Sequence, residues 1–355
     1  MSVFSASAFD RHELVSFCSD KRSGLRAIIA VHDSTLGPGV GGCRMYPYAS
    51  DEEALHDVLR LSRGMTYKSA LAGLPLGGGK SVIIGDPLRD KNRDLMLAMG
   101  EFIESQGGRY VAAEDSGTGV ADIRLMAERT RYVSGMDDNE FGGDPSPSTA
   151  YGVFLGISTA VRHRLGVDGV RGISIAIQGL GHVGYYLARY LVAEGAVVHG
   201  ADVNAQNLQR AVTELGVIPE SPDAILALEV DVLAPCAMGA VLNARTIPSI
   251  RAGIIAGAAN NQLATGHDGA SLQDRGILYC PDFLINAGGI IDVHHQRIAS
   301  SESAKRSHIQ GIETNLARVL QRADETHTQT AVIAEGLAEE IIRESGPAMP
   351  LAAMG

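Results

Sequence analysis

The sequence predicts an α/β protein with two domains, and three observations support this. The chain has 355 residues, enough for about two domains of ordinary size. Short apolar runs alternate with segments of helical periodicity, as expected where helices connect the strands of a sheet. The 42 glycines form no low-complexity run, so they fit the many tight turns of such a fold.

The first half of the chain is expected to alternate strands with helices. Ser50 and Glu53 form a capping box at the start of one segment with helical spacing. In order, the predicted elements are a strand within 25–38, a helix at 50–73, a strand at 81–85, a helix at 93–108 and a strand within 109–119. Residues 1–135 are therefore predicted to form the first domain, completed by a C-terminal helical segment over 326–355.

A run rich in glycine and proline, GGDPSPST over Gly142–Thr149, separates the two halves. Two prolines and two glycines in eight residues fit a hinge or a linker. Downstream, a helical pattern is followed by short apolar strands that each end in small or polar residues. Because ligands bind at the carboxyl ends of strands in an open α/β sheet, we expect residues 140–325 to form a ligand-binding domain.

The bulk composition argues against several classes of protein. A formal net charge of −11 disfavours nucleic acid or an anionic membrane as the main partner. No run reaches the ~18 apolar residues of a membrane span, and the N-terminus lacks the basic start of a signal peptide. The four cysteines include no C-x-x-C pair, which predicts reduced thiols in a cytoplasmic protein.

A G-x-G-x-x-G motif begins at Gly179, directly after an apolar strand predicted at 173–177. A helix is predicted after it, and Asp202 ends the next strand 23 residues later (202 − 179), close to the ~20 typical of dinucleotide-binding motifs. This context predicts a Rossmann-type domain whose helix N-terminus binds a pyrophosphate. The predicted cofactor-binding turn consists of Gly179, Leu180, Gly181, His182, Val183 and Gly184.

The three glycines and Asp202 have separate expected roles. Gly179 permits the tight turn, Gly181 lets the backbone approach the pyrophosphate, and Gly184 lets helix and strand pack closely. Asp202 is expected to accept hydrogen bonds from the ribose hydroxyls and to repel a 2′-phosphate. The next residues include no arginine, so NAD is predicted rather than NADP. A glycine turn without a ligand and another adenylated ligand such as FAD are the alternatives.

The segment GLPLGGGKS, Gly73–Ser81, looks at first like a phosphate-binding P-loop. That motif requires glycine six residues before Lys80, where Leu74 stands. We therefore expect the glycines to clear space for a substrate.

Lys68, Lys80 and Asp115 all lie at expected element boundaries. A lysine can pair with a substrate carboxylate, a second lysine nearby would have a depressed pKa and act as a base, and an aspartate could relay protons. A solvated surface charge is the alternative for each residue.

Eight motifs occur in order along nearly the whole chain: TLGPGVGGCRM, RLSRGMTYKSALAGLPLGGGKSVIIGDP, AAEDSGTG, DPSPSTAYGV, IQGLGHVG, LAPCAMGAVLN, IIAGAANNQLA and GILYCPDFLINAGG. Together they resemble the glutamate/leucine/phenylalanine/valine dehydrogenase family, and most of all its leucine dehydrogenases. The resemblance implies reversible NAD-dependent oxidative deamination of an L-amino acid to a 2-oxo acid and ammonia. It also implies a substrate-binding and oligomerisation domain at 1–135, a cleft, and an NAD-binding domain at 140–325, in a homo-oligomer without a resident metal ion.

The resemblance further implies roles for single residues. Lys68 would bind the substrate α-carboxylate, and Lys80 would activate water against the imine. Asp115 would exchange protons with the amino group, which the backbone carbonyl of Gly42 would help to hold. The residues implied around the nicotinamide and its ribose are Thr149, Pro235, Cys236, Ala237, Asn260, Asn261 and Asn286.

The implied side-chain pocket is apolar. It consists of Val40, Met65, Ala113, Ile290 and Val293, with Asn260 and Asn261 as further substrate contacts. Walls without charge disfavour glutamate, whose side-chain carboxylate would need a basic partner. Aliphatic walls favour leucine, valine or isoleucine, while phenylalanine or tryptophan stays open because one methylene changes discrimination by only ~1–3 kcal/mol. A non-catalytic NAD-binding protein is the remaining alternative. His294 and His295 are expected on a polar pocket rim or on the surface.

Overall fold

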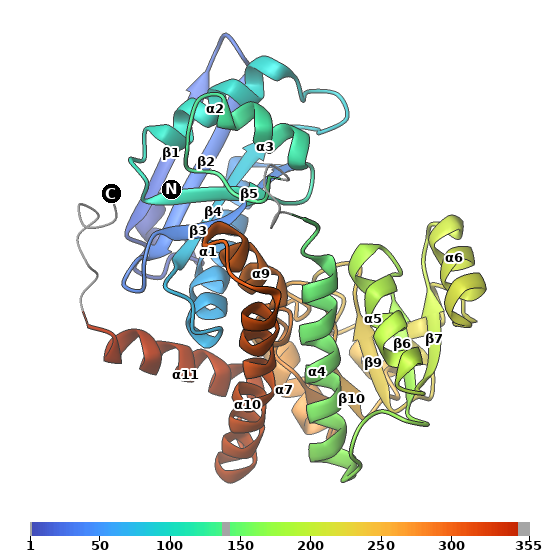
Figure 1. Cartoon of the computed structure of the whole chain (residues 1–355). Helices are drawn as coiled ribbons and strands as arrows, with labels where there is room; N and C mark the ends of the chain where they lie inside the picture. Colours follow the sequence, from blue (N-terminus) through green and yellow to red (C-terminus); the bar gives the residue numbers. More distant parts are fainter. Residues whose placement is uncertain (1, 137–142, 347–355) are drawn as a thin grey trace. The chain divides into compact units, whose positions relative to one another are not determined.

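A computed structural model describes residues 2–136 and 143–346 of the chain. Contacts divide the chain into two compact units, Met1–Gly143 with Ala338–Gly355 and Asp144–Leu337. Each unit is built on one β-sheet with helices on its faces, which confirms the predicted two-domain α/β fold (Figure 1). The substrate-binding and NAD-binding roles expected for the two halves remain predictions.

The first unit contains a five-stranded mixed sheet in the order β1-β2-β4-β3-β5. β2 pairs antiparallel with both β1 and β4, whereas β3 runs parallel to both β4 and β5. Parallel neighbours require long crossover connections, and helices supply them. The strands are β1 (Leu14–Asp20), β2 (Leu25–Asp33), β3 (Gly39–Tyr46), β4 (Gly77–Ile84) and β5 (Tyr110–Glu114).

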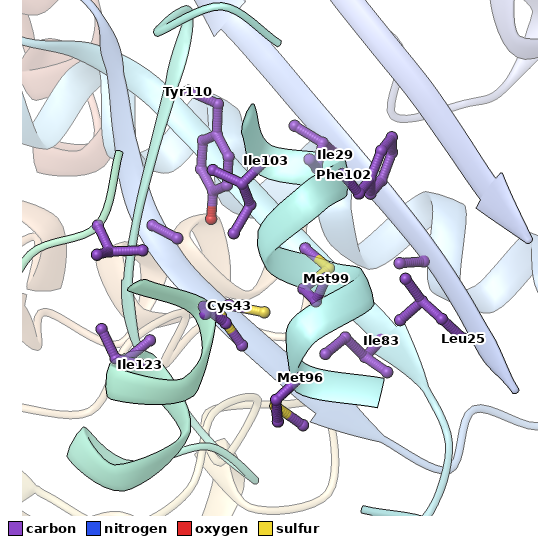
Figure 2. Packing of buried hydrophobic residues seen from close by; sticks show 14 of the residues in the cluster. Leu25, Ile29, Cys43, Ile83, Met96, Met99, Phe102, Ile103, Tyr110 and Ile123 are labelled. Carbon is purple, nitrogen blue, oxygen red and sulfur yellow. The ribbon is translucent and has the colours of Figure 1, made fainter. Parts of the chain in front are cut away.

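Helices cover both faces of this sheet. α1 (Asp51–Leu71) packs its apolar stripe against β2 and β4 on one face. α2 (Arg93–Glu104) and α3 (Val120–Ala127) enclose a larger apolar core on the other face (Figure 2). The burial of apolar surface on both faces fixes the positions of the central strands β4 and β3.

The N-terminus of α1 carries the predicted cap in part. The Ser50 hydroxyl accepts a hydrogen bond of 3.1 Å from the Glu53 N–H. The Glu53 carboxylate accepts one of 2.8 Å from the Ala49 N–H rather than from Ser50. The first half of the capping box is therefore confirmed, and the second half is displaced by one residue.

Strand β4 begins earlier than predicted. It starts at Gly77 instead of Ser81, so Lys80 lies inside a strand and not at an element boundary. Glycines carry no apolar period, which is why the sequence pattern placed the start of the strand after them. Lys80 is therefore held within the sheet, where it pairs with Ala30 of β2.

The glycines of β4 allow close packing. A Cβ at Gly78 would overlap the Oγ1 and the backbone nitrogen of Thr66 and the carbonyl oxygen of Ser62, both in α1. A Cβ at Gly77 would overlap the carbonyl oxygen of Asp33 in β2. The space in front of these glycines is filled by the protein itself, so they do not clear room for a substrate as the sequence suggested.

The second unit contains a six-stranded sheet in the order β11-β10-β9-β6-β7-β8, and every pair in it is parallel. Counted from β6, this is the 3-2-1-4-5-6 order of a Rossmann fold, with the switch point between β6 and β9. The predicted Rossmann-type domain is therefore confirmed. The strands are β6 (Ser174–Gln178), β7 (Val197–Ala201), β8 (Ile218–Pro219), β9 (Val232–Pro235), β10 (Ile254–Ile255) and β11 (Leu278–Tyr279).

The helices of the second unit connect these strands and cover the sheet. α4 contacts α5, α9 and α10, and it also reaches β10. α11 continues from this unit into the first unit. The helices are α4 (Ser146–Leu165), α5 (His182–Ala193), α6 (Ala205–Leu215), α7 (Gly266–Asp274), α8 (Asp282–Ile285), α9 (Gly288–Arg297), α10 (Glu302–Thr326) and α11 (Thr330–Glu344).

The run at 142–149 is a linker only in part. Gly142 lies outside the described residues. Helix α4 begins at Ser146 with Pro147 in its first turn, where the missing N–H costs nothing because the first N–H groups of a helix lack partners anyway. The last four residues of the run are therefore helical, and the two compact units meet in the chain just before them.

The packing of β4 against α1 predicts the effect of a single methyl group. Gly78→Ala should lower the thermal unfolding midpoint, with a loss of about 1–3 kcal/mol or more, because backbone atoms stand in the way of the new Cβ. Gly64→Ala in α1 is the matched control, since a Cβ there would meet no described atom within 4 Å outside its own helix backbone. Alanine should stabilise that site by ~1 kcal/mol. A Gly78→Ala protein as stable as the parent would contradict this packing.

Candidate active site

The two residues predicted to carry the chemistry contact each other in the first unit. Lys80 lies in β4, Asp115 directly follows β5, and the Lys80 Nζ forms an ion pair with Oδ2 of Asp115. The Lys80 side chain is 8% exposed and the Asp115 side chain 16% exposed. An ion pair at this depth is costly to desolvate unless other groups match its charges.

Arg44 in β3 is the second cation at Asp115. Its Nη2 lies 3.6 Å from Oδ1 of Asp115, and its Nη1 lies 2.9 Å from Oδ2 of Asp57 in α1. Tyr48 donates a hydrogen bond of 2.6 Å to the same oxygen of Asp57. Burial raises the pKa of the Asp115 carboxyl, but the charges of Lys80 and Arg44 outweigh burial and hold it at about 2. Asp115 is therefore ionised at neutral pH.

Sequence reasoning missed Arg44, Asp57 and Tyr48. Arg44 stands in the strand GVGGCRMY, among residues that are otherwise small or apolar except for its final tyrosine. A charged residue in a buried strand is rarely without a partner, so this arginine was a signal that an acidic group lies near. Nothing in the local pattern identifies that group, because Asp57 comes from a helix and Asp115 from another strand end.

Gly42 in β3 lies against Asp115. A Cβ at Gly42 would be 2.6 Å from the Asp115 Cβ and 2.8 Å from the Glu114 carbonyl oxygen, so only glycine fits. Gly42 pairs with Ala113 in the parallel ladder of β3 and β5. By this register, the predicted pocket residues Val40 and Ala113 share one face of the sheet.

Lys68 and Met65 lie one turn apart towards the end of α1. Lys68 is 9% exposed, and Met65 is half-buried, with its Cγ 3.3 Å from the place that a Cβ would take at Gly41. Because Lys80 is only 7% exposed, both predicted lysines are buried in the same unit. The alternative of a solvated surface charge is therefore wrong for both.

The glycine motif of the second unit has the backbone geometry expected of it. Gly179 has a φ of 95°, which glycine adopts without strain. A Cβ at Gly184 would overlap the carbonyl oxygen of Gly179, so helix α5 and strand β6 pack as closely as predicted. At Gly181, the N-cap of α5, a Cβ would meet no described atom within 4 Å. The backbone there is open to a ligand such as a pyrophosphate, whose binding stays a prediction.

Asp202 follows β7 and ties the glycine turn to that strand. Its Oδ2 accepts a hydrogen bond of 2.7 Å from the Leu180 N–H, and its Oδ1 accepts one of 2.7 Å from the Asn204 N–H. The Asn207 Nδ2 donates a second hydrogen bond of 3.3 Å to Oδ2, so Oδ1 is the oxygen that can accept a further one from a ribose hydroxyl. His182 and Val183 form the first turn of α5.

The residues predicted around the nicotinamide follow the carboxyl ends of neighbouring strands. Pro235 ends β9, and Cys236 and Ala237 come next. A Cβ at Gly179 would lie 2.7 Å from the Ala237 Cβ, so this segment borders the glycine turn. Burial raises the pKa of the Cys236 thiol to about 12, which leaves a neutral wall residue and no thiolate nucleophile.

Asn286 follows α8 and is 4% exposed. Its Nδ2 donates to the Asn260 Oδ1 at 2.8 Å and to the Ala258 carbonyl oxygen at 3.0 Å. Its Oδ1 has no hydrogen-bond partner among the described residues. A buried oxygen without a donor costs roughly 1–3 kcal/mol, so a donor from a ligand, such as a nicotinamide carboxamide, fits this position. Asn261, which follows Asn260 in the chain, has a backbone φ of 52°, a value that asparagine tolerates better than most residues.

Helix α9 carries the other two predicted pocket residues. Ile290 and Val293 are both half-buried. The start of this helix packs on the first turn of α4, where a Cβ at Gly289 would lie 2.5 Å from the Thr149 Oγ1. The predicted nicotinamide residue Thr149 therefore lies against the start of the helix that carries Ile290 and Val293.

The histidine pair of α9 differs from expectation in one respect. His294 is half-buried, but His295 is 8% exposed and hydrogen-bonds His308 of α10 with 3.0 Å between the ring nitrogens. It packs between helices instead of lying on a rim or on the surface.

Within the described part of the chain, no group of three or more His, Cys, Asp or Glu side chains could hold a metal ion. Over residues 2–136 and 143–346, no helix is long and apolar enough to cross a membrane.

The predicted site residues thus form two sets, one in each unit. The first unit holds Val40, Gly42, Met65, Lys68, Lys80, Ala113 and Asp115. The second unit holds Thr149, the 179–184 turn, Asp202, Pro235, Cys236, Ala237, Asn260, Asn261, Asn286, Ile290 and Val293. That the two sets face each other across a cleft stays a prediction.

Both units of the chain match models of known protein families. Residues 12–132 match the model of the Glu/Leu/Phe/Val dehydrogenase dimerisation domain. Residues 144–339 match the model of the Glutamate/Leucine/Phenylalanine/Valine dehydrogenase domain. The two matches cover most of the chain and meet at the boundary between the compact units.

Individual relatives agree with this assignment. The chain is 47% identical to a leucine dehydrogenase of Geobacillus stearothermophilus over 333 residues, which are 93% of this chain and 90% of that protein. It is 44% identical to a valine dehydrogenase of Streptomyces coelicolor over 344 residues, 95% of this chain and 93% of that protein. The crystal structure of L-tryptophan dehydrogenase from Nostoc punctiforme superposes with a TM-score of 0.81 at 41% identity, covering 94% of this chain and 96% of that one. The chain therefore belongs to the Glu/Leu/Phe/Val dehydrogenase family, whose members are amino-acid oxidoreductases that use NAD or NADP.

Proposed function

We propose that the chain catalyses the reversible, NAD-dependent oxidative deamination of branched-chain L-amino acids to 2-oxo acids and ammonia. The observation that carries this proposal is the ion pair of the buried Lys80 with the half-buried Asp115 beside Gly42. Buried charges cost stability, and they are retained most often where a site has a chemical task. The leucine and valine dehydrogenases among the relatives support the class of substrate.

Each of the four polar groups predicted for the site in the first unit would have a task in this reaction. Lys68 would pair with the substrate α-carboxylate as a point charge. Lys80 would take a proton from the water that attacks the imine carbon, and Asp115 would exchange a proton with the amino group. The Gly42 carbonyl, which can only accept hydrogen bonds, would hold the amine. NAD, when bound, supplies the hydride acceptor.

Arg44 would keep Asp115 charged while these protons move. If Lys80 were the only cation at Asp115, loss of its proton would leave a buried carboxylate without an opposite charge. Arg44 stands 3.6 Å from Asp115 and is itself fixed by Asp57 at 2.9 Å. The carboxylate therefore keeps a cationic neighbour through the cycle. When Lys80 gives up its proton, Asp115 does not become a negative charge without a positive partner.

The second unit supports NAD as the cofactor. The turn at Gly181 is open to a pyrophosphate, and the unpartnered Oδ1 of Asn286 fits a carboxamide donor. Asp202 would meet the adenosine ribose and repel a 2′-phosphate. Residues 203–207 carry no positive charge that could bind such a phosphate. These features together favour NAD over NADP.

Aromatic amino acids are the second candidate substrates. The five expected wall residues lack charge, which disfavours glutamate. Aliphatic walls alone discriminate weakly, because one methylene is worth only ~1–3 kcal/mol. The similarity to the L-tryptophan dehydrogenase structure, with a TM-score of 0.81 at 41% identity, is the specific observation that favours this candidate.

We also propose a cytoplasmic homo-oligomer that assembles through the first unit. The match of residues 12–132 to a dimerisation domain supports assembly. β1 is an edge strand of its sheet and exposes 57% of Phe17, a combination that permits pairing with a second copy. All four cysteines are free thiols, as expected in a reducing compartment. A monomeric mass by light scattering would contradict this assembly.

A substrate panel followed by NADH absorbance tests the proposed function. We expect kcat/KM for L-leucine, L-valine and L-isoleucine to exceed that for L-phenylalanine, L-tryptophan and L-glutamate by about tenfold or more, with NAD preferred over NADP. Tryptophan or phenylalanine turned over about tenfold better than leucine would establish the second candidate instead. NAD binding without NADH production from any amino acid would point to a non-catalytic protein.

The low pKa of Asp115 predicts how stability depends on pH. Because its folded pKa of about 2 lies below the ordinary 3.8, the carboxylate contributes stability that is fully present above about pH 4 and is lost as pH falls towards 2. Asp115→Asn should be less stable than the parent by about 2 kcal/mol near pH 7, with a gap that narrows below about pH 4.

Urea unfolding across this pH range measures the gap. Asp51→Asn is the control, because it removes an exposed ion pair with Arg26 and should change stability by less than ~1 kcal/mol. A gap between the parent and Asp115→Asn that stays constant down to about pH 3 would contradict the proposed charge balance.

A further inference from the structure

The ladder between strands β3 and β4 is interrupted next to Lys80. It pairs Gly39 with Gly77 and Val40 with Gly78, and it resumes with Cys43 opposite Ser81. Gly41 and Gly42 are skipped on this side, although they pair with Ala112 and Ala113 of β5 on the other. The two glycines therefore stay in the ladder with β5 but form no ladder pair with β4 beside Lys80.

Tyr110 fills the interruption. It comes from β5, is fully buried, and runs into the apolar core on the α2 side of the sheet (Figure 2). A Cβ at Gly79 would lie 2.7 Å from its ring, so the absence of a side chain at that position lets the ring reach β4. The Tyr110 hydroxyl donates a hydrogen bond of 2.8 Å to the Gly41 carbonyl oxygen and lies 3.3 Å from the Gly42 carbonyl oxygen.

The direction of this hydrogen bonding is fixed by the groups involved. A carbonyl oxygen can only accept, so the single Tyr110 hydroxyl proton is committed to the glycine carbonyls. The Ser81 hydroxyl, 3.0 Å away, must then donate to the Tyr110 oxygen. Tyr110 and Ser81 are both fully buried, and no water is needed to complete the chain. The Tyr110 hydroxyl, held by Ser81, thus contacts the carbonyls of the two residues that β4 does not pair.

We propose that the Tyr110 hydroxyl, supported by Ser81, fixes the Gly41–Gly42 backbone so that the Gly42 carbonyl receives the substrate amine and ammonia beside Lys80 and Asp115. This inference rests on the proposed function, because that function supplies the amine. Two consecutive glycines have more backbone freedom than any other pair, so their carbonyls need an external group to fix them. The Gly42 oxygen lies on the side of the interrupted ladder, so beyond the Tyr110 contact at 3.3 Å it keeps an acceptor direction for a ligand.

Because a carbonyl oxygen accepts hydrogen bonds and cannot donate them, this site favours the substrates that carry N–H groups, the amino acid and ammonia. Amines and ammonia carry N–H donors, whereas the reacting carbonyl of a 2-oxo acid has none. A fixed carbonyl beside the reacting carbon therefore assists the amino acid and ammonia but not the 2-oxo acid. Tyr110 and Ser81 are positioning residues in this scheme, since neither needs to touch the substrate.

Tyr110→Phe tests the proposal because it removes one hydroxyl and keeps the ring. The KM values for ammonia and for L-leucine should rise about tenfold, while the KM for the 2-oxo acid changes by less than about twofold. Inhibition by isocaproate, which has the carboxylate and side chain but neither amine nor oxo group, should be unchanged. Ser81→Ala should change the same two KM values in the same direction by about threefold, since Tyr110 keeps its bond to Gly41.

Tyr279→Phe is the matched control. Tyr279 is 5% exposed in the second unit, and its hydroxyl donates to Asp282 at 2.8 Å, so this variant also loses one buried tyrosine hydroxyl. Its KM for ammonia should equal that of the parent. A Tyr110→Phe enzyme with unchanged KM for ammonia, or with all KM values raised equally, would overturn the proposal.

Hydrogen exchange separates this inference from the proposed function. In Tyr110→Phe the amides of residues 39–46 should exchange faster than in the parent or in Tyr279→Phe, whether or not the substrate class is correct. Unchanged exchange in that segment would refute the positioning role. A parent protein that turns over no amino acid would refute the proposed function instead, while faster exchange would still support the role of Tyr110.

Discussion

The ion pair between Lys80 and Asp115 is the interaction on which the arrangement of the first unit depends, because its two charges need compensating groups around them. Lys80 is buried in β4 and Asp115, just after β5, is half-buried, so each charge must find compensation inside the protein. Arg44 and Asp57 extend the pair into an alternating row of charges that ends on helix α1. The row has no net charge, which is how the interior can hold a lysine at the centre of a sheet. The same row leaves Asp115 ionised and ready to exchange a proton.

Glycine is the second constraint, and it acts differently in the two units. In the first unit, Gly78 lets α1 lie on the sheet, and Gly42 lets Asp115 lie against β3. In the second unit, Gly184 brings α5 onto β6, while Gly181 leaves open backbone for a ligand. A missing side chain therefore serves packing at most of these positions and ligand access at one. Ordering these glycines costs backbone entropy in both units, and in return the chain makes close contacts that a larger residue would prevent.

Much of the fold was predictable because its signals are local. The glycine motif, its preceding strand and Asp202 lie within one βαβ unit, so the Rossmann order followed from spacing. The start of β4 was missed because a glycine run has no apolar period, and the first turn of α4 was missed because Pro147 looked like a linker residue. Arg44 and Tyr110 could not be assigned, since their partners are brought together only by the pairing of distant strands.

The central claim is that the Lys80 amine performs the chemistry, and chemical rescue tests it most directly. Lys80→Ala should lose nearly all NADH production from L-leucine, by about a thousandfold or more, because a general base is worth up to ~10⁴ in rate. Added methylamine or ethylamine should restore part of that rate, in proportion to amine concentration, by entering the space the side chain left. A folded Lys80→Ala protein that keeps near-full activity without added amine would contradict the account.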